Sequence, residues 1–98
     1  MKNFKTYQIA VDFYRLLAPE QLPGHLKDQL NRASSSIALN LAEGAGRFNK
    51  KDQRRFYKIA YGSLRECKAI IEIGEIRDSK IESCADKLGA HLYKLIKS

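Results

Sequence analysis

The sequence has few of the residues that mark irregular or cross-linked structure. Its 98 residues include two prolines, two cysteines and no tryptophan, and 11 acidic residues stand against 18 lysines and arginines. Two cysteines without a C-x-x-C spacing do not provide a disulfide framework. Both fall at apolar positions of predicted helices, so we interpret Cys67 and Cys84 as small core residues in a reducing compartment.

Long hydrophobic runs are also missing. The first five residues lack the apolar stretch of a signal peptide, and no run approaches the ~20 residues that span a bilayer. We therefore expect a cytoplasmic protein with no membrane contact. A hydrophobic content of 44% with 30% charged residues is typical of a folded chain, and 98 residues suffice for one domain, 1–98.

Apolar residues recur at intervals of three and four on both sides of a proline-containing loop, 18–24. The intervals predict one helix over about 5–18 and a second over about 24–43. Gly44 and Gly46 then supply the permissive backbone that is expected to end the second helix.

Two further helices are predicted in the second half of the chain. Asn49 is a candidate N-cap for a helix over about 50–74, with Asp52 favourable near its positive end. Ser79–Glu82 matches a capping box at the start of a helix over about 79–97. No segment alternates as a strand does, so we predict an all-α fold, an antiparallel up-and-down four-helix bundle.

The third helix carries a heptad-like apolar seam. The seam runs through Phe56, Ala60, Ser63, Cys67, Ile70 and Gly74, flanked by Tyr57, Leu64 and Ile71. Gly62 interrupts this helix at a cost of about 1 kcal/mol relative to alanine. We interpret it as a point where another helix approaches closely, either within the bundle or across a subunit contact.

A second pattern covers residues 26–74. It comprises Leu26, Gln29, Arg32, Ala33, Ser36, Ile37, Asn40, Ala42, Glu43, Gly44, Arg47, Lys50, Lys51, Asp52, Phe56, Ala60, Gly62, Ser63, Leu64 and Glu66. It resembles the four-helix-bundle proteins encoded in intervening sequences of bacterial 23S rRNA genes. The resemblance implies a homo-oligomer, often a ring-shaped pentamer. It also implies kinship with accessory proteins of diversity-generating retroelements, which bind a reverse transcriptase and nucleic acid.

Positive charge is concentrated after Gly46. Six cations against the single carboxylate of Asp52 give +5 of the net charge of +7 within residues 47–58: Arg47, Lys50, Lys51, Arg54, Arg55 and Lys58. Cations along one helix suit contacts with a nucleic-acid backbone, and an exposed Tyr57 or Tyr61 would be able to stack on a base. The alternative is an ordinary solvated helix face.

Polar residues flank the apolar sides of the second and third helices. They are Arg32, Ser36, Asn40, Glu43, Ser63 and Glu66. Our main interpretation is structural, with hydrogen bonds between helices that fix their register. The alternative is that the carboxylates of Glu43 and Glu66 form a pair for acid–base chemistry or metal binding. The Glu-x-x-His motif of di-metal bundles is missing.

No catalytic, metal or cofactor constellation emerges, so we expect a protein that is not an enzyme. The leading hypothesis is an oligomeric bundle that binds RNA or DNA backbone through its basic surface. The alternative is an adaptor that docks a nucleic-acid enzyme such as a reverse transcriptase, using an apolar stripe left exposed on the first and last helices.

Overall fold

The computed structural model describes residues 4–98 and is all-helical, as predicted. No strand occurs within that range. Four α-helices and one short 3₁₀ helix follow in the order α1 (Lys5–Leu16), η1 (Pro19–Gln21), α2 (Gly24–Ala45), α3 (Lys50–Ile73) and α4 (Ser79–Lys97). The predicted bounds hold within one or two residues. The first helix ends early, at Leu16, where Leu17 is already extended; Pro19 disfavours helical geometry only in Ala18, the residue before it.

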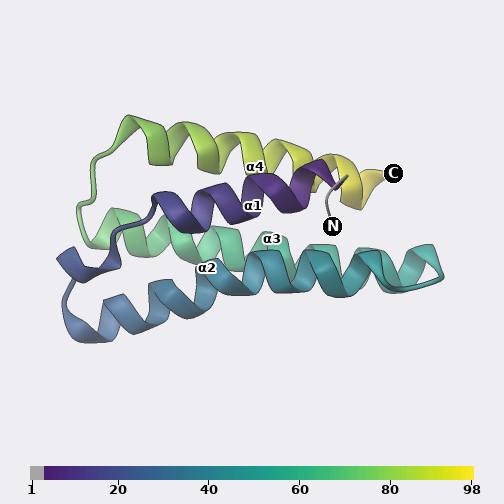
Figure 1. Ribbon diagram of the computed structural model, residues 1–98, viewed down its shortest axis with the longest axis horizontal. Helices are drawn as coiled ribbons and strands as arrows, with labels where there is room; N and C mark the ends of the chain where they lie inside the picture. The colour runs from purple at the N-terminus through teal and green to yellow at the C-terminus, as the bar shows by residue number, and fades with distance from the viewer. Residues whose placement is uncertain (1–3) are drawn as a thin grey trace.

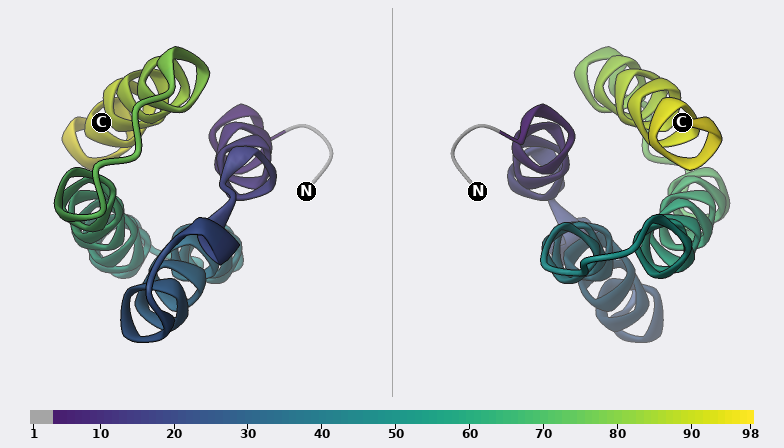
Figure 2. Two further views of the ribbon diagram at one scale, coloured as in Figure 1. Left: turned by 90° about the vertical axis from the view of Figure 1, so that its left-hand side faces the viewer. Right: turned by 90° about the vertical axis from the view of Figure 1, so that its right-hand side faces the viewer.

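Successive helices run in opposite directions (Figure 1). Each helix packs against two others, in the cycle α1–α2–α3–α4–α1, and the view along the long axis shows them side by side in that order (Figure 2). This arrangement is compatible with the predicted up-and-down bundle. The contact between α2 and α3 is the most extensive of the four.

One apolar core fills the space between the helices, and every α-helix contributes to it. Its large, fully buried members are Phe13, Leu30, Ile37, Leu41, Leu64, Leu88, Leu92 and Cys67. The placement of Cys67 in the core agrees with its interpretation from the sequence, and Cys84 is half-buried against the same cluster.

The seam predicted for α3 is rotated relative to the core. Tyr57 and Leu64, predicted to flank the seam, are buried, whereas Phe56 and Ser63 are only half-buried. Ser63 sits at the edge because its hydroxyl has a polar partner on α2, described below. An apolar stripe of this width fixes which side of a helix is inward but leaves its rotation open by a few tens of degrees.

The two predicted N-caps have different outcomes. Asn49 caps α3 as predicted, since its Oδ1 accepts a hydrogen bond from the Asp52 amide at 2.7 Å. The capping box at Ser79 is wrong. Asp78 is the N-cap of α4, and its Oδ1 accepts from the amides of Lys80 at 2.9 Å and Ile81 at 3.3 Å. The carboxylate of Asp78 is a stronger acceptor than a serine hydroxyl, and it moves Ser79 into the first helical turn.

The α2–α3 hairpin extends beyond the ends of α1 and α4, so its turn forms one end of the molecule (Figure 1). Gly44 is not a terminator, as predicted from the sequence, but a buried position inside α2. A Cβ there would lie 2.7 Å from Tyr57 Cε1 and 3.1 Å from the Phe56 Cβ. No glycine of the described chain has a positive φ, and Gly46 ends α2 in a helical conformation. Gly44 therefore serves close helix packing.

Gly62 has a different environment. It is exposed on α3, and a Cβ there would have no neighbouring atom within 4 Å. The interpretation that Gly62 admits another helix within the bundle is therefore wrong. The other interpretation, a contact between subunits, stays a prediction.

These two glycines provide a matched pair of stability measurements. We expect Gly44→Ala to destabilise the protein by about 1–3 kcal/mol, because the new methyl group overpacks the buried Tyr57 ring. Gly62→Ala should instead stabilise the fold by roughly 0.5–1 kcal/mol, since the helix gains propensity without a clash. Urea unfolding followed by circular dichroism measures both. Equal effects of the two substitutions would contradict the close packing at Gly44.

Burial of the Cys67 thiol, assisted by the negative charge of Glu66, raises its pKa from 9.0 to about 12. The folded state therefore keeps this proton to a higher pH than the unfolded state. Its contribution to stability is complete below pH 9 and is lost as the pH rises toward 12, at up to about 1.4 kcal/mol per pH unit. We expect the free energy of unfolding of Cys67→Ala to fall less steeply than that of the wild type over this range. Parallel curves would show that Cys67 does not contribute.

Candidate functional site

The six predicted cations gather at the free end of the α2–α3 hairpin. Arg47 lies in the turn after α2, and Lys50, Lys51, Arg54, Arg55 and Lys58 occupy the first turns of α3. All are exposed except Arg54, which is half-buried. We call this set the basic tip.

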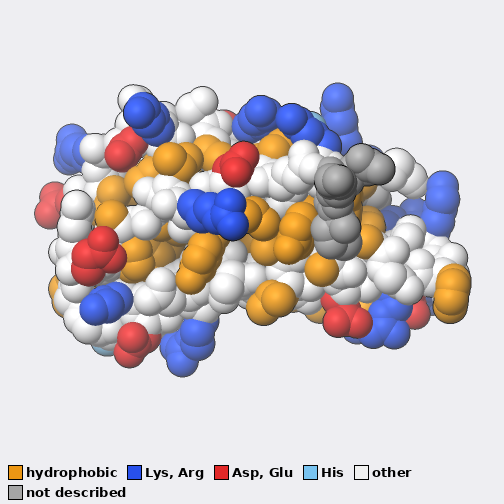
Figure 3. Space-filling view, viewed as in Figure 1, with side chains coloured by type: hydrophobic (Ala, Val, Ile, Leu, Met, Phe, Trp, Pro, Cys, Tyr) orange, Lys and Arg blue, Asp and Glu red, His pale blue; other side chains and the backbone are white. Residues whose placement is uncertain are grey.

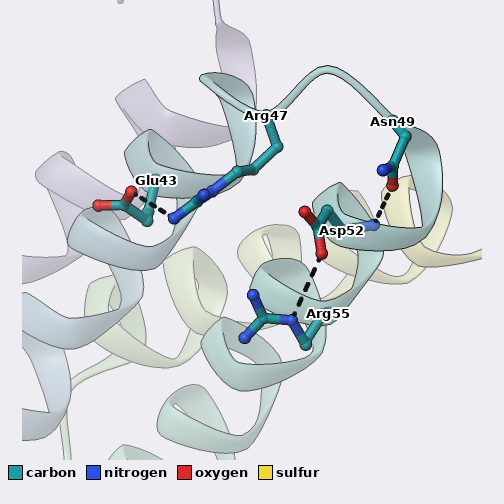
Figure 4. A network of polar contacts seen from close by, with 5 residues as sticks. All are labelled: Glu43, Arg47, Asn49, Asp52 and Arg55. Atoms are coloured by element: carbon teal, nitrogen blue, oxygen red, sulfur yellow. Dashed lines mark hydrogen bonds and ion pairs between the residues drawn. The ribbon is translucent and has the colours of Figure 1, made fainter.

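Two of the six cations form ion pairs with carboxylates three or four residues before them in the sequence (Figure 4). An Arg47 guanidinium nitrogen lies 3.0 Å from Glu43 Oε2, and Arg55 Nε lies 3.7 Å from Asp52 Oδ1. Both pairs are exposed, so each contributes only about 0–1 kcal/mol to stability. Their main effect is to orient the two arginines beside the turn.

The other four cations, Lys50, Lys51, Arg54 and Lys58, have no carboxylate within ion-pair distance in the part of the chain that the structure describes. Their charges are therefore available to an external anion. Because ion pairs neutralise only two of the six positions, the excess charge inferred from the sequence persists in the folded molecule.

The aromatic ring of Phe56 contacts the two arginines that form ion pairs, Arg47 and Arg55. The guanidinium carbon of Arg47 lies 4.8 Å from the ring centroid, and that of Arg55 lies 4.4 Å from it. Contacts of this kind are worth about 0.5–1 kcal/mol at exposed sites. Phe56 is thus half-buried under two guanidinium groups, and the sequence signal for these contacts is the pair of arginines near it, Arg47 and Arg55.

The folded chain adds a cation that is remote in sequence. Lys97, near the end of α4, lines a shallow groove of ≈ 1010 Å³ together with Asn49, Lys51, Asp52, Arg54, Arg55, Lys58 and Ile96. Five cations and one carboxylate thus surround this groove. Sequence reasoning missed Lys97 because its position depends on how α4 crosses α3.

The aromatic residues at this end do not occupy the predicted positions. Tyr57 is buried, and that burial raises its pKa, while Tyr61 is half-buried. The exposed aromatic residue of the turn is instead Phe48, which has 106% of its reference accessible area. Sequence analysis passed over Phe48 because it belongs to no apolar stripe. A large aromatic residue in a turn between cations was the available signal.

The predicted polar set divides into a network and isolated members. The hydroxyls of Ser36 and Ser63 share a 2.9 Å hydrogen bond between α2 and α3. Asn40 Nδ2 donates to the Ser36 carbonyl at 2.9 Å and to its hydroxyl at 3.0 Å. Arg32 and Glu66 are exposed outside this network, and Glu43 binds Arg47 instead.

The geometry does not bring Glu43 and Glu66 together. Because α2 and α3 are antiparallel, the register set by Gly44 against Tyr57 puts Glu43 level with about Lys58, and Glu66 lies eight residues farther along α3, about 12 Å away. In residues 4–98, no three His, Cys, Asp or Glu side chains lie close enough to hold a metal ion. The alternative interpretation of these two carboxylates as a pair is therefore wrong.

Carboxylates accumulate at the opposite end of the molecule. A hollow of ≈ 650 Å³ between the end of α3 and the start of α4 is lined by Glu72, Glu75, Glu82 and Asp86, with Lys68 and Arg77. Lys68 Nζ lies 3.5 Å from Asp86 Oδ1. Carboxylates thus outnumber cations around this hollow, whereas cations outnumber carboxylates at the basic tip.

None of the described helices combines the length and the apolar character that crossing a membrane requires. Comparisons with curated proteins and with solved structures give no match. A family model does match, and it covers residues 4–98, the whole described chain. Its description, 23S rRNA-intervening sequence protein, agrees with the resemblance noted in residues 26–74. The chain therefore belongs to the family of 23S rRNA-intervening sequence proteins.

Proposed function

We propose that this protein is a non-enzymatic, oligomeric helical bundle in the cytoplasm that binds the sugar-phosphate backbone of RNA or DNA through the basic tip. The observation that carries the proposal is a set of four exposed or half-buried cations at the projecting end of the hairpin that have no carboxylate partner among residues 4–98. Unpaired cations at one end of an elongated molecule attract a polyanion and release its counterions on contact.

The geometry favours contacts to phosphates over contacts to base edges. Lys51, Arg55 and Lys58 repeat at intervals of four and three residues, or about 4.5–6 Å along the helix. They line a shallow groove together with Lys97, so a strand can lie across the groove without entering a deep pocket. No side chain of the groove is held in a bidentate arrangement for a base, and binding should tolerate many sequences.

Membership in the family does not choose between the two polymers. The family description names the intervening sequence of 23S rRNA and no ligand. The bundle's own chemistry does not distinguish RNA from DNA, because the basic tip would contact groups that both share. The proposal therefore names the backbone as the ligand.

Charge reversal tests this function. We expect Arg54→Glu, Arg55→Glu and Lys58→Glu, combined in one variant, to weaken binding to a labelled RNA at least about tenfold. The slope of log affinity against log salt should fall by about three, one for each lost phosphate contact. Fluorescence anisotropy in a salt titration measures both quantities.

The matched control reverses three exposed cations at the opposite end, Lys27, Arg77 and Lys80. It changes the net charge equally and leaves the basic tip intact. Equal weakening by both variants would mean that net charge alone drives binding. Wild-type protein without salt-dependent binding would contradict the proposed function.

An exposed apolar strip on α3 supports the oligomeric part of the proposal. Ile59, Gly62, Ala69 and Ile73 are all exposed and recur at spacings that keep them on one side of the helix, where the exposed Glu66 interrupts them. Leu39 on α2 is 67% exposed and lies near the level of Ile59. The open space at Gly62 would admit a second copy of the chain, and the resemblance implies five copies.

A large charged side chain in that open space tests the assembly. We expect the wild type to elute with a mass several times 11.2 kDa, about 56 kDa for a pentamer, and Gly62→Arg to dissociate it. Gly24→Arg is the matched control, because Gly24 also has nothing within 4 Å of a Cβ position. Chromatography with light scattering measures the masses. A monomeric wild type, or dissociation by both variants, would contradict this interface.

A second candidate function is the adaptor that docks a nucleic-acid enzyme such as a reverse transcriptase. It is favoured by exposed apolar side chains on α1 and α4, where Tyr14 is 44%, Leu16 40% and Tyr93 55% exposed. Hydrophobic side chains gather over α1 and its neighbours on the face seen in Figure 3. A protein partner that stays bound after nuclease treatment would favour this candidate over direct binding to nucleic acid.

A further inference from the structure

Phe48 is the most exposed large hydrophobic residue of the described chain. It lies in the turn between α2 and α3, at the end of the molecule that projects beyond the other helices (Figure 1). Its sequence neighbours are Arg47 and Asn49, whose side chains are both engaged, one with Glu43 and the other with the amide of Asp52. The residues on both sides of Phe48 are therefore fixed by hydrogen bonds. The Phe48 ring itself makes no aromatic–aromatic or cation–π contact with any described side chain.

Other aromatic rings at this end are already occupied. Phe56 lies against the guanidinium groups of Arg47 and Arg55, and Tyr57 is buried beside Phe4 with ring centroids 6.2 Å apart. Tyr93, 55% exposed near the end of α4, has Lys97 Nζ 5.6 Å from its ring centroid.

Phe48 is therefore the exposed aromatic ring of the turn itself, with no ring or cation contact among residues 4–98. A single exposed apolar side chain is common on protein surfaces. Phe48 is a candidate for ligand contact because cations lie on both sides of it in the sequence, Arg47 before it and Lys50 and Lys51 after it.

We propose that Phe48 stacks on an unpaired base, so that the basic tip prefers single-stranded or looped nucleic acid to a continuous duplex. This inference rests on the proposed function, because the cations must first hold the backbone. The cations near the ring attract a polyanion. Among polyanions, a nucleic acid carries flat aromatic bases, and a base is able to stack on the phenyl ring of Phe48.

The geometry explains the preference for unpaired bases. A base in a duplex already stacks on both neighbours, and only its edges are accessible in the grooves. A base in a loop or single strand exposes its face, and stacking on an aromatic side chain adds affinity without requiring a particular sequence. The projecting hairpin carries the ring beyond α1 and α4, so neither helix obstructs a strand that approaches the turn.

Three substitutions at Phe48 test the stacking. The side chain is exposed, so none of them should disturb the fold. The probes are a single-stranded RNA of about 12 nucleotides that carries a fluorescent purine analogue, and a blunt duplex with the same number of phosphates per strand. We expect Phe48→Ala and Phe48→Leu to weaken single-strand binding about five- to 150-fold, and Phe48→Trp to retain it.

Binding to the duplex should change less than about twofold in all three variants, and the salt dependence should stay that of the wild type, because no phosphate contact is lost. Fluorescence quenching of the purine analogue should accompany binding by the wild type and Phe48→Trp only. Tyr14→Ala is the matched control, an exposed aromatic residue on α1 away from the basic tip.

Each other outcome has a distinct meaning. If Phe48→Leu binds the single strand as well as the wild type, the ring makes a general apolar contact and the stacking is wrong. If Phe48→Ala changes the oligomeric mass, the residue contacts another protein chain and the inference fails. If salt-dependent binding persists with equal affinity for both probes in all variants, the proposed function stands and the stacking is wrong. If the wild-type protein shows no salt-dependent binding to either probe, both the proposed function and the stacking are wrong.

Discussion

Everything at the candidate site depends on the close packing of α2 against α3. The hydroxyls of Ser36 and Ser63 join the two helices at mid-length, and Gly44 admits the Tyr57 ring near the turn. These two contacts fix how far one helix can slide or rotate on the other. Because the hairpin extends beyond the other helices, the bundle core cannot hold its free end, and these contacts must position the cations there.

The helices themselves could be predicted because their signals are local. Apolar spacing of three and four, a proline-containing loop and the cap at Asn49 each act within a few residues. Rotation about the helix axis could not be predicted, and for that reason Tyr57 replaced Phe56 in the core. The N-cap of α4 is Asp78 and not the predicted Ser79, because the capping-box motif does not take account of a stronger acceptor in the preceding residue.

The basic tip was predictable in part, and the reason is again distance along the chain. Its six cations fall within twelve residues, so a count of charges finds them. Lys97 joins them only through the packing of α4, and Phe48 has no periodic neighbours that would reveal its exposure. Of the polar set, Ser36, Asn40 and Ser63 come together, but Arg32 and Glu66 turn to solvent, because a strip beside an apolar stripe includes positions on both sides of its border.

Charge is distributed unevenly along the long axis of this elongated protein, so the molecule carries an electric dipole moment. Its principal extents are 40 × 23 × 22 Å, with the lysines and arginines of the basic tip at one end of the long axis and the carboxylates near Glu75 at the other. A polyanion exerts a torque on such a dipole before the surfaces touch. The protein therefore rotates toward the polyanion as it approaches, and the hairpin turn is the first part of the protein to touch it.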